Sequence, residues 1–435
     1  MIRNKTKRIW NRTKSLAYLN KLLIKYYNSG KTARQEGRTI AYVSVGFPVE
    51  LLYAIDVLPY FPQNHAAFYG TQGKTDDVFG PAEGVGMYST DLCSEIKATI
   101  GMALAGESLT FSIPKPDLII SANNICGSIT KCAEALSRYY QVPLFLIDTP
   151  FVSSTVNSHS IDYVKTQFKD LISFLEKATG RKYDYDKLAE VCDLSWQALN
   201  LWKEIVDLSK NIPAPQNGLD SFTHILPLTT LRGTEDAVNY YQRLKSEIQK
   251  RVEQKVSAIP EERYRLFWDF LPIYHKMKYL SKVFTRYNAC FVAASFFFPV
   301  LREENVGEDV DPGHVDSKNM TPDQILHYLS LAYLTLYVNR TVDYKASLFT
   351  KLGQDFSIDG FVFHVDRSCK PQSLPQYELR NFMEEAGFAT LIIDADSMDP
   401  RYFSEAQVTT RIEAFMEALE NNTERPKRKQ KIQTT

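Results

Sequence analysis

Excess charge of either sign is missing from the sequence. Its 435 residues include 51 Lys+Arg and 51 Asp+Glu, so the formal net charge at pH 7 is zero. The overall charge therefore does not favour a polyanionic partner, and we expect no nucleic-acid ligand. Basic residues do gather near the two ends, within residues 1–31 and 425–429. Clusters of this kind are usually solvated tails.

Long apolar runs are missing as well. The longest candidate, residues 289–301, is shorter than the ~18 uncharged apolar residues that suggest a membrane-spanning helix. The basic N-terminus lacks the continuous apolar segment of a signal peptide. From these two absences we expect a soluble, cytoplasmic protein without a membrane partner.

The cysteines lack the spacing of familiar metal motifs. Six are present, and none forms the C-x₂-C pairs that zinc sites and ferredoxins use. Disulfides are rare in the cytoplasm, which leaves packed thiols, a nucleophile or metal ligands from distant parts of the chain. The sequence also lacks a G-x₄-G-K-[ST] phosphate loop, so we expect any ATP to bind to another chain.

Strand-like and helical patterns alternate from residue 39 onwards. Two apolar runs at 116–121 and 143–148 enclose a segment of helical period at 127–140. Strand, helix and strand in this order form a βαβ unit, which implies a parallel sheet covered by helices. A second series of the same kind begins at residue 263. We therefore predict an α/β protein with two Rossmann-like parallel-sheet lobes.

Helical segments account for the rest of the predicted architecture. Amphipathic patterns cover residues 163–178, 185–209 and 235–255, between the two α/β series. The N-terminal segment also has a helical pattern, with a break expected at Gly30. The predicted domains are an N-terminal helical segment at 1–38, a first α/β domain at 39–158, a helical insertion at 159–260, and a second α/β domain with a C-terminal helix and a basic tail at 261–435.

Three of the six cysteines fall at the predicted starts of helices. Cys126 and Cys369 follow apolar strands, and Cys93 precedes a helical segment that extends to about residue 104. In open parallel sheets, ligands bind beyond the carboxyl ends of the strands. The amide groups at a helix start also stabilise negative charge. These positions favour metal ligands, although the sequence spacing alone leaves packed thiols open.

The other three cysteines occupy ordinary positions. Cys132 and Cys192 lie inside predicted helices, and Cys290 begins an apolar strand. Buried thiols commonly pack as small apolar groups in such places. We therefore interpret these three as core residues.

Six short motifs stand out along the chain: PQNHAA at 62–67, DLCS at 91–94, ANNICG at 122–127, DTPF at 148–151, HVDRSCKP at 364–371 and QVTTRIEAFM at 407–416. These motifs resemble those of one known family, the benzoyl-CoA reductases and 2-hydroxyacyl-CoA dehydratases. The chain looks most similar to the B-type subunit of ATP-dependent benzoyl-CoA reductase, and the resemblance extends over residues 39–419.

The resemblance implies a cofactor and partners that the sequence pattern does not supply. It implies that Cys93, Cys126 and Cys369 ligate one [4Fe–4S] cluster with one iron left open. It also implies an acyl-CoA thioester substrate, a homologous cluster-bearing subunit, and a separate ATP-hydrolysing activator that supplies electrons of low potential. The missing phosphate loop agrees with ATP binding on that separate protein.

Several reactions fit this resemblance. Reductive dearomatisation of an aromatic acyl-CoA is our first expectation. Dehydration of a 2-hydroxyacyl-CoA through a ketyl radical comes second. The identity of the acyl group stays open because Cys132 occupies a position where we associate an aromatic residue with the reductases. Two more hypotheses are a double-cubane reductase that uses all six cysteines and a non-catalytic subunit that only relays electrons.

Two histidines lie near the motifs. His65 follows a strand-like segment, and we expect it in a loop, either as a proton donor in catalysis or bonded to the backbone. His364 lies on the strand before Cys369, and we expect it in the core or behind the metal ligands.

Overall fold

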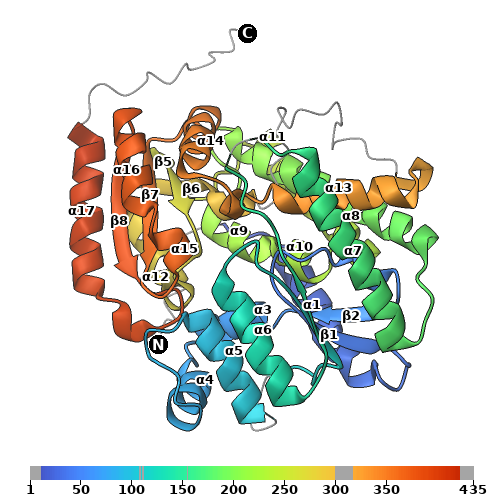
Figure 1. Ribbon diagram of the computed structural model, residues 1–435. Coiled ribbons are helices and arrows are strands. Elements are labelled where there is room, and N and C mark those ends of the chain that lie inside the picture. Colours follow the sequence, from blue (N-terminus) through green and yellow to red (C-terminus); the bar gives the residue numbers. More distant parts are fainter. Residues whose placement is uncertain (1–10, 107–108, 110–111, 154, 299–316, 422–435) are drawn as a thin grey trace, which may run out of the picture.

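A computed structural model describes residues 11–106, 109, 112–153, 155–298 and 317–421 (Figure 1). The basic tail at 425–429 and the basic residues before residue 11 lie outside the described residues. No described helix is both long enough and apolar enough to cross a membrane.

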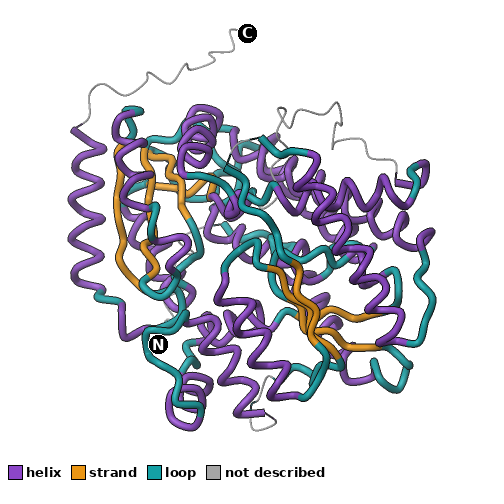
Figure 2. The backbone as a smooth tube through the Cα atoms, in the orientation of Figure 1, coloured by secondary structure: helices purple, strands orange, loops and turns teal. Residues whose placement is uncertain are grey.

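Two separate four-stranded sheets form the centres of two lobes, and every strand pairing in them is parallel. Figure 2 shows the sheets as two orange groups with helices around and between them. The prediction of a two-lobed α/β fold is therefore confirmed. The first sheet contains β1 (Thr39–Val43), β2 (Val57–Tyr60), β3 (Leu118–Ala122) and β4 (Leu144–Ile147), and the second contains β5 (Tyr264–Asp269), β6 (Ala289–Ala294), β7 (Gly360–Asp366) and β8 (Ala389–Ala395).

The two sheets have the same strand order. The first is β2-β1-β3-β4 and the second is β6-β5-β7-β8. In each sheet, the second strand lies on one side of the first strand, and the third strand lies on its other side. The direction in which the chain adds strands therefore reverses between β1 and β3 in the first sheet and between β5 and β7 in the second, and these places are the switch points. Ligands in open parallel sheets bind beyond the carboxyl ends of the strands at such points. Cys126 follows β3 and Cys369 follows β7, so these cysteines occupy equivalent places in the two lobes.

The central strands are buried on both faces. Every residue of β3, β5 and β6 is buried, as expected for parallel strands covered by helices on each side. The helices of the first lobe are α2 (Glu50–Tyr53), α3 (Pro62–Gln72), α4 (Asp76–Gly80), the π-helix η1 (Pro81–Val85), α5 (Ser94–Ala105) and α6 (Gly127–Tyr140), of which α2 packs on β2 and α6 on β3 and β4. The helices of the second lobe are α12 (Met277–Arg286), α14 (Val342–Asp355), α15 (Lys370–Ser373), α16 (Gln376–Glu385) and α17 (Glu405–Asn421), with α17 against β8 at the outer edge (Figure 1).

Long helices between the two sheets follow the amphipathic patterns. Asn157 and Asp184 cap two of them by accepting hydrogen bonds from the amides of Ser160 and Lys187. α11 packs on α8, and α13 packs on α7, although the predicted boundaries place α13 in the second domain. Those boundaries stay a prediction. The helices are α7 (Ser158–Thr179), α8 (Tyr185–Asp207), α9 (Gly218–His224), α10 (Leu226–Thr230), α11 (Glu235–Glu253) and α13 (Pro322–Leu334).

Gly30 does not break the N-terminal helix, contrary to the sequence expectation. α1 (Leu16–Thr32) continues through it and packs on α11. A Cβ atom at Gly30 would collide with the Tyr60 side chain and with Pro114. The glycine therefore allows close packing of α1 against the first lobe, and its helix propensity is a minor cost.

A cluster of four charges, with Lys97 and Asp399 buried at its centre, connects the lobes. Lys97 on α5 lies 2.8 Å from Glu83 Oε1 and 3.3 Å from Asp399 Oδ2, which follows β8 in the second lobe. Arg401 pairs with the same two carboxylates at 2.6 and 2.5 Å. Both cations also lie near the Phe79 ring. The Lys97 side chain is fully buried, so the attraction acts where water screens it little.

Replacing Lys97 with Met should weaken the connection between the lobes. Glu83 and Asp399 would lose one of two cations, and Asp399 is almost completely buried. Breaking a buried ion pair in this way typically costs about 3 kcal/mol of folding free energy. The measurement is denaturant unfolding of the full chain.

The matched control is Lys131→Met on α6, because the Lys131 side chain is exposed and pairs with Glu134 at 3.1 Å on the surface. Its effect should stay below about 1 kcal/mol. Equal unfolding midpoints for the two variants would contradict a special role for Lys97.

Candidate functional site

Cys93, Cys126 and Cys369 each occupy the position directly before a helix. They are the N-cap residues of α5, α6 and α15, as the sequence predicted for helix starts. All three are partly exposed, whereas the other three cysteines of the chain, Cys132, Cys192 and Cys290, are buried. The six cysteines therefore separate into two groups of different environment.

The fold brings the three N-cap cysteines together from both lobes. Cys93 interacts electrostatically with Cys126 and with Cys369. Next to them, the amide of Ser94 donates a hydrogen bond of 3.1 Å to Ser368 Oγ across the boundary between the lobes. The candidate site is thus the place where the starts of α5, α6 and α15 meet.

Burial dominates the electrostatics of these thiols. Burial is the largest effect on each thiol, and it raises the pKa of all three. The negative charge of Glu95 raises the pKa of Cys93 further, and Cys93 does the same to Cys369. Amide groups in the first turns of the following helices act in the opposite direction, but more weakly. Protein groups alone therefore favour neutral thiols, and a bound metal would be needed to hold thiolates here.

Cysteine thiols are the donors that bind iron–sulfur clusters, so the donor type at this site is compatible with one. No group of three or more His, Cys, Asp or Glu within the described ranges is placed to bind one ion. Thiolates that hold a cluster bind different iron atoms, so they need not converge on one point. Three partly exposed thiols at neighbouring helix starts, without a disulfide between them, meet this requirement.

Two asparagines shape the loop that carries Cys126. Asn124 Nδ2 donates to the Gly46 carbonyl at 3.1 Å, and Asn123 Oδ1 accepts from the Thr149 amide at 2.6 Å. Asn123 Nδ2 also donates to Asp148. The amides of both side chains are thus used to fix the loop after β3, which explains why this motif is rich in asparagine.

An acidic group borders the site, and sequence reasoning identified only one of its members, Asp366 near Cys369. Ser368 Oγ donates to Asp396 Oδ2 at 2.6 Å, and Tyr274 Oη donates to Glu95 Oε1 at 3.1 Å. Burial raises the pKa of Glu95 and that of Asp366 to about 7. Asp366, which lies close to Cys369 in the HVDRSCKP motif, was a signal in the sequence, and so was the position of Glu95 near Cys93. Tyr274 and Asp396 reach the site only through tertiary structure.

His65 lies on a helix, not in the loop expected from the sequence. It belongs to the first turn of α3 and is 5% exposed. Its ring lies against those of Tyr27, Phe68 and Tyr69, at centroid distances of 4.9, 6.3 and 6.0 Å. These contacts do not include a cysteine, and the role of His65 as a proton donor stays a prediction.

His364 is a core residue, one of the two roles expected for it. It is fully buried, its Nδ1 lies 2.8 Å from the Leu271 carbonyl, and its ring lies beside Trp268.

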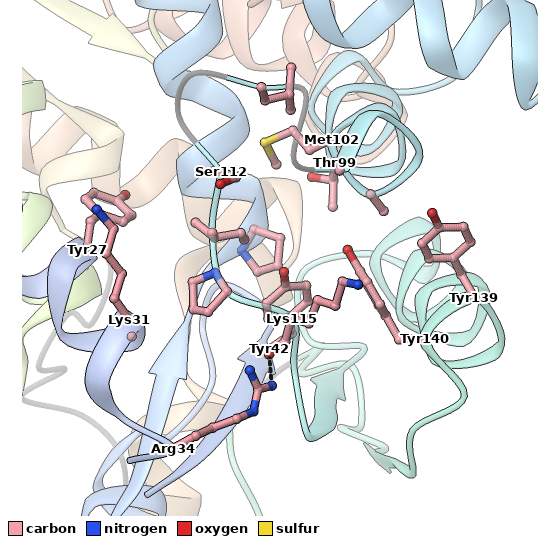
Figure 3. Close-up of a pocket in the computed structure, with 17 residues that line it drawn as sticks. Tyr27, Lys31, Arg34, Tyr42, Thr99, Met102, Ser112, Lys115, Tyr139 and Tyr140 are labelled. Atoms are coloured by element: carbon pink, nitrogen blue, oxygen red, sulfur yellow. Dashed lines mark hydrogen bonds between the residues drawn. The ribbon is translucent and has the colours of Figure 1, made fainter. Parts of the chain in front are cut away.

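A cavity of about 850 Å³ lies at the far ends of α5 and α6. Figure 3 shows Tyr139 and Tyr140 on one side of it and Tyr27 and Lys31 on the other. α6 has 14 residues, so this cavity is separated from Cys126 by about 20 Å along the helix. Its Arg34 is already paired with Asp117 at 3.0 Å. The cavity is therefore distinct from the cysteine site.

Comparison with known proteins gives one family and several relatives. Residues 44–419 match the model of the family described as 2-hydroxyglutaryl-CoA dehydratase, D-component. The chain is 30% identical to the (R)-2-hydroxyisocaproyl-CoA dehydratase alpha subunit of Clostridioides difficile, over 92% of this chain and 95% of that subunit. It is 29% identical to the (R)-phenyllactyl-CoA dehydratase alpha subunit of Clostridium sporogenes, over 93% and 96%. It is 28% identical to the B-type subunit of benzoyl-CoA reductase from Thauera aromatica, over 85% and 86%.

Replacing Glu95 with Gln should change stability in a pH-dependent way. Burial raises the Glu95 pKa from an ordinary 4.5 to about 7, so its contribution to stability is lost as the pH rises through this interval. At pH 8 the wild-type chain holds a buried carboxylate that the variant lacks, and the variant should unfold at a higher denaturant concentration. At pH 5 the carboxyl is mostly protonated in the fold, and the two midpoints should nearly coincide.

Glu134→Gln serves as the control. Lys131 lowers the pKa of this exposed carboxyl, so its replacement should bring no gain at pH 8. A Glu95→Gln variant whose midpoint differs from wild type by the same amount at pH 5 and pH 8 would contradict the raised pKa.

Proposed function

This chain belongs to the family of the 2-hydroxyglutaryl-CoA dehydratase D-component, and we propose that it carries a [4Fe–4S] cluster in an enzyme that acts on acyl-CoA thioesters. The family expected from the sequence motifs is thereby confirmed, and so is an enzyme subunit, since the relatives are dehydratase and reductase subunits. The cluster, its ligands and the substrate are the proposed part.

The single observation that supports the cluster is the convergence of three N-cap cysteines. Cys93 and Cys126 belong to the first lobe and Cys369 to the second, and Cys93 interacts with each of the other two although they are far apart in sequence. A cluster bound by these three thiolates would have one iron free of protein ligands and would supply an electron and a Lewis-acidic corner. The protein would bind the cluster at three helix starts and keep the site partly closed to water.

Two reactions are compatible with this site. Reductive dearomatisation of an aromatic acyl-CoA was the first expectation from the sequence, and a benzoyl-CoA reductase is among the relatives. Dehydration of a 2-hydroxyacyl-CoA is the reaction in the names of the dehydratase relatives. Sequence identities of 28–30% do not separate the two reactions.

The proposed assembly needs two further proteins. The names of the relatives refer to subunits, which supports a partner subunit, and we propose that it is homologous and bears a second cluster. A separate ATP-hydrolysing activator would supply the electron, because the chain has no phosphate loop of its own.

Metal content tests the ligand assignment. The chain purified anaerobically should contain about four iron and four sulfide ions, as one cubane requires. Replacing Cys93, Cys126 or Cys369 with Ala should remove or convert the cluster, as followed by visible and EPR spectra and by iron analysis.

Cys192→Ala is the matched control, since Cys192 is buried in α8 and should leave the spectra unchanged. About eight iron ions, as two cubanes require, would favour the double-cubane reductase, and a metal-free native protein would refute the proposal.

His65→Ala tests the proposed proton donor. Loss of a general acid usually slows turnover by roughly 10²-fold, while iron content should stay at the wild-type value because His65 is not a proposed ligand. Turnover is measured with (R)-phenyllactyl-CoA and with benzoyl-CoA in the anaerobic complex. His65→Phe keeps the packing against Tyr27 and Tyr69, and normal turnover in this variant would assign His65 to packing alone.

A further inference from the structure

Unpaired polar atoms gather at the carboxyl end of β5, beside the proposed cluster site. Asp269 ends this strand and is 2% exposed. Its Oδ2 accepts a hydrogen bond of 2.6 Å from Gln376 Nε2, whereas its Oδ1 is buried without a hydrogen-bond partner among the described residues. Native proteins leave few buried polar atoms unpaired, and each of these needs an explanation.

Lys345 on α14 brings an ammonium group to the same place. It is 4% exposed and interacts electrostatically with Asp269 and with Cys369. Within the part of the chain that the structure describes, no carboxylate lies within ion-pairing distance of its Nζ, which lies 5.7 Å from the centre of the Tyr337 ring. Burial lowers the pKa of Lys345 and raises that of Asp269, while their mutual attraction and the hydrogen bonds of Asp269 with Ser295 and Gln376 act in the opposite direction.

Tyr337 completes the group. Its Oη is buried without a hydrogen bond among the described residues, with the Ser295 side chain as a polar neighbour, and the residue interacts electrostatically with Asp269 and Cys369. Two donors, Lys345 Nζ and Tyr337 Oη, and one acceptor, Asp269 Oδ1, are thus left open in one buried region next to Cys369.

The backbone supports a functional role for this region. Phe270, directly after Asp269, has a φ of 77°, which is strained for a bulky residue without glycine's freedom. Such strain gathers at functional sites. The position is also the switch point between β5 and β7, where open parallel sheets bind ligands.

We propose that Asp269, Lys345 and Tyr337 bind the 2-hydroxyl group of a 2-hydroxyacyl-CoA next to Cys369. This inference rests on the proposed function and names the class of its substrate. A hydroxyl group donates one hydrogen bond and accepts two, so it can donate to Asp269 Oδ1 and accept from Lys345 and Tyr337. An aromatic ring without a substituent would leave all three atoms unpaired, and a carboxylate would be repelled by Asp269.

The test compares two thioesters that differ only in this hydroxyl. The complex, purified anaerobically, is titrated with (R)-phenyllactyl-CoA and, separately, with 3-phenylpropionyl-CoA. Titration calorimetry gives the dissociation constant of each thioester. Hydrogen bonds to charged groups contribute enough for a preference of roughly 10- to 100-fold for the hydroxylated thioester. Lys345→Met should reduce this preference to near unity, mainly by weakening the binding of (R)-phenyllactyl-CoA.

Lys351→Met is the matched control, because Lys351 lies on the same helix with an exposed side chain and should keep the wild-type preference. Tyr337→Phe provides a second variant in case Lys345→Met fails to fold, and it should reduce the preference several-fold. Equal affinities of the wild-type complex for the two thioesters would overturn this inference while leaving the proposed function intact. An unchanged preference in both variants would do the same. A complex that binds neither thioester would contradict the proposed function itself.

Discussion

The buried ammonium group of Lys97 is the contact on which the geometry of the cysteine site depends. Its side chain joins Glu83 of the first lobe to Asp399 of the second, and its backbone amide donates to the Cys93 carbonyl at 2.8 Å in the first turn of α5. The residue that connects the lobes is therefore also the residue that fixes the helix start at Cys93. Because Cys369 belongs to the other lobe, a small rotation between the lobes would change its separation from Cys93 and Cys126.

The site combines opposing effects on charge. Helix starts favour thiolates at Cys93, Cys126 and Cys369, while burial and the nearby carboxyls disfavour them more strongly. Glu95 and Asp366 respond to the same environment, since burial raises the pKa of each to about 7. The fold therefore supplies the positions of the ligands, and the positive charge that would ionise them has to come with a metal.

The sequence predicts what depends on local pattern and fails where tertiary contacts decide. The unit β3-α6-β4 and the N-cap positions of the three cysteines follow from short apolar runs and turn residues, and they are present as expected. β2 and α14 were missed because their patterns are short or mixed, and α1 continues through Gly30 because Tyr60 packs there. The groups around Asp269 come from β5, η7 (Tyr337–Asn339) and α14, and no spacing in the sequence connects them.

The two candidate reactions place different demands on the space beside Cys369. A ring to be reduced needs an apolar wall, because unpaired polar atoms around it cost free energy in a low-dielectric site. A 2-hydroxyacyl group brings a hydroxyl that satisfies a donor and an acceptor together. The Lys345 ammonium has no carboxylate within ion-pairing distance among the described residues, whereas the similarly enclosed cations of Lys97, Arg232 and Arg265 each have at least one. Lys345 lies at the switch point of the second lobe, so its missing partner is better explained by a ligand than by imperfect packing, and a hydroxylated acyl group is the ligand whose chemistry fits.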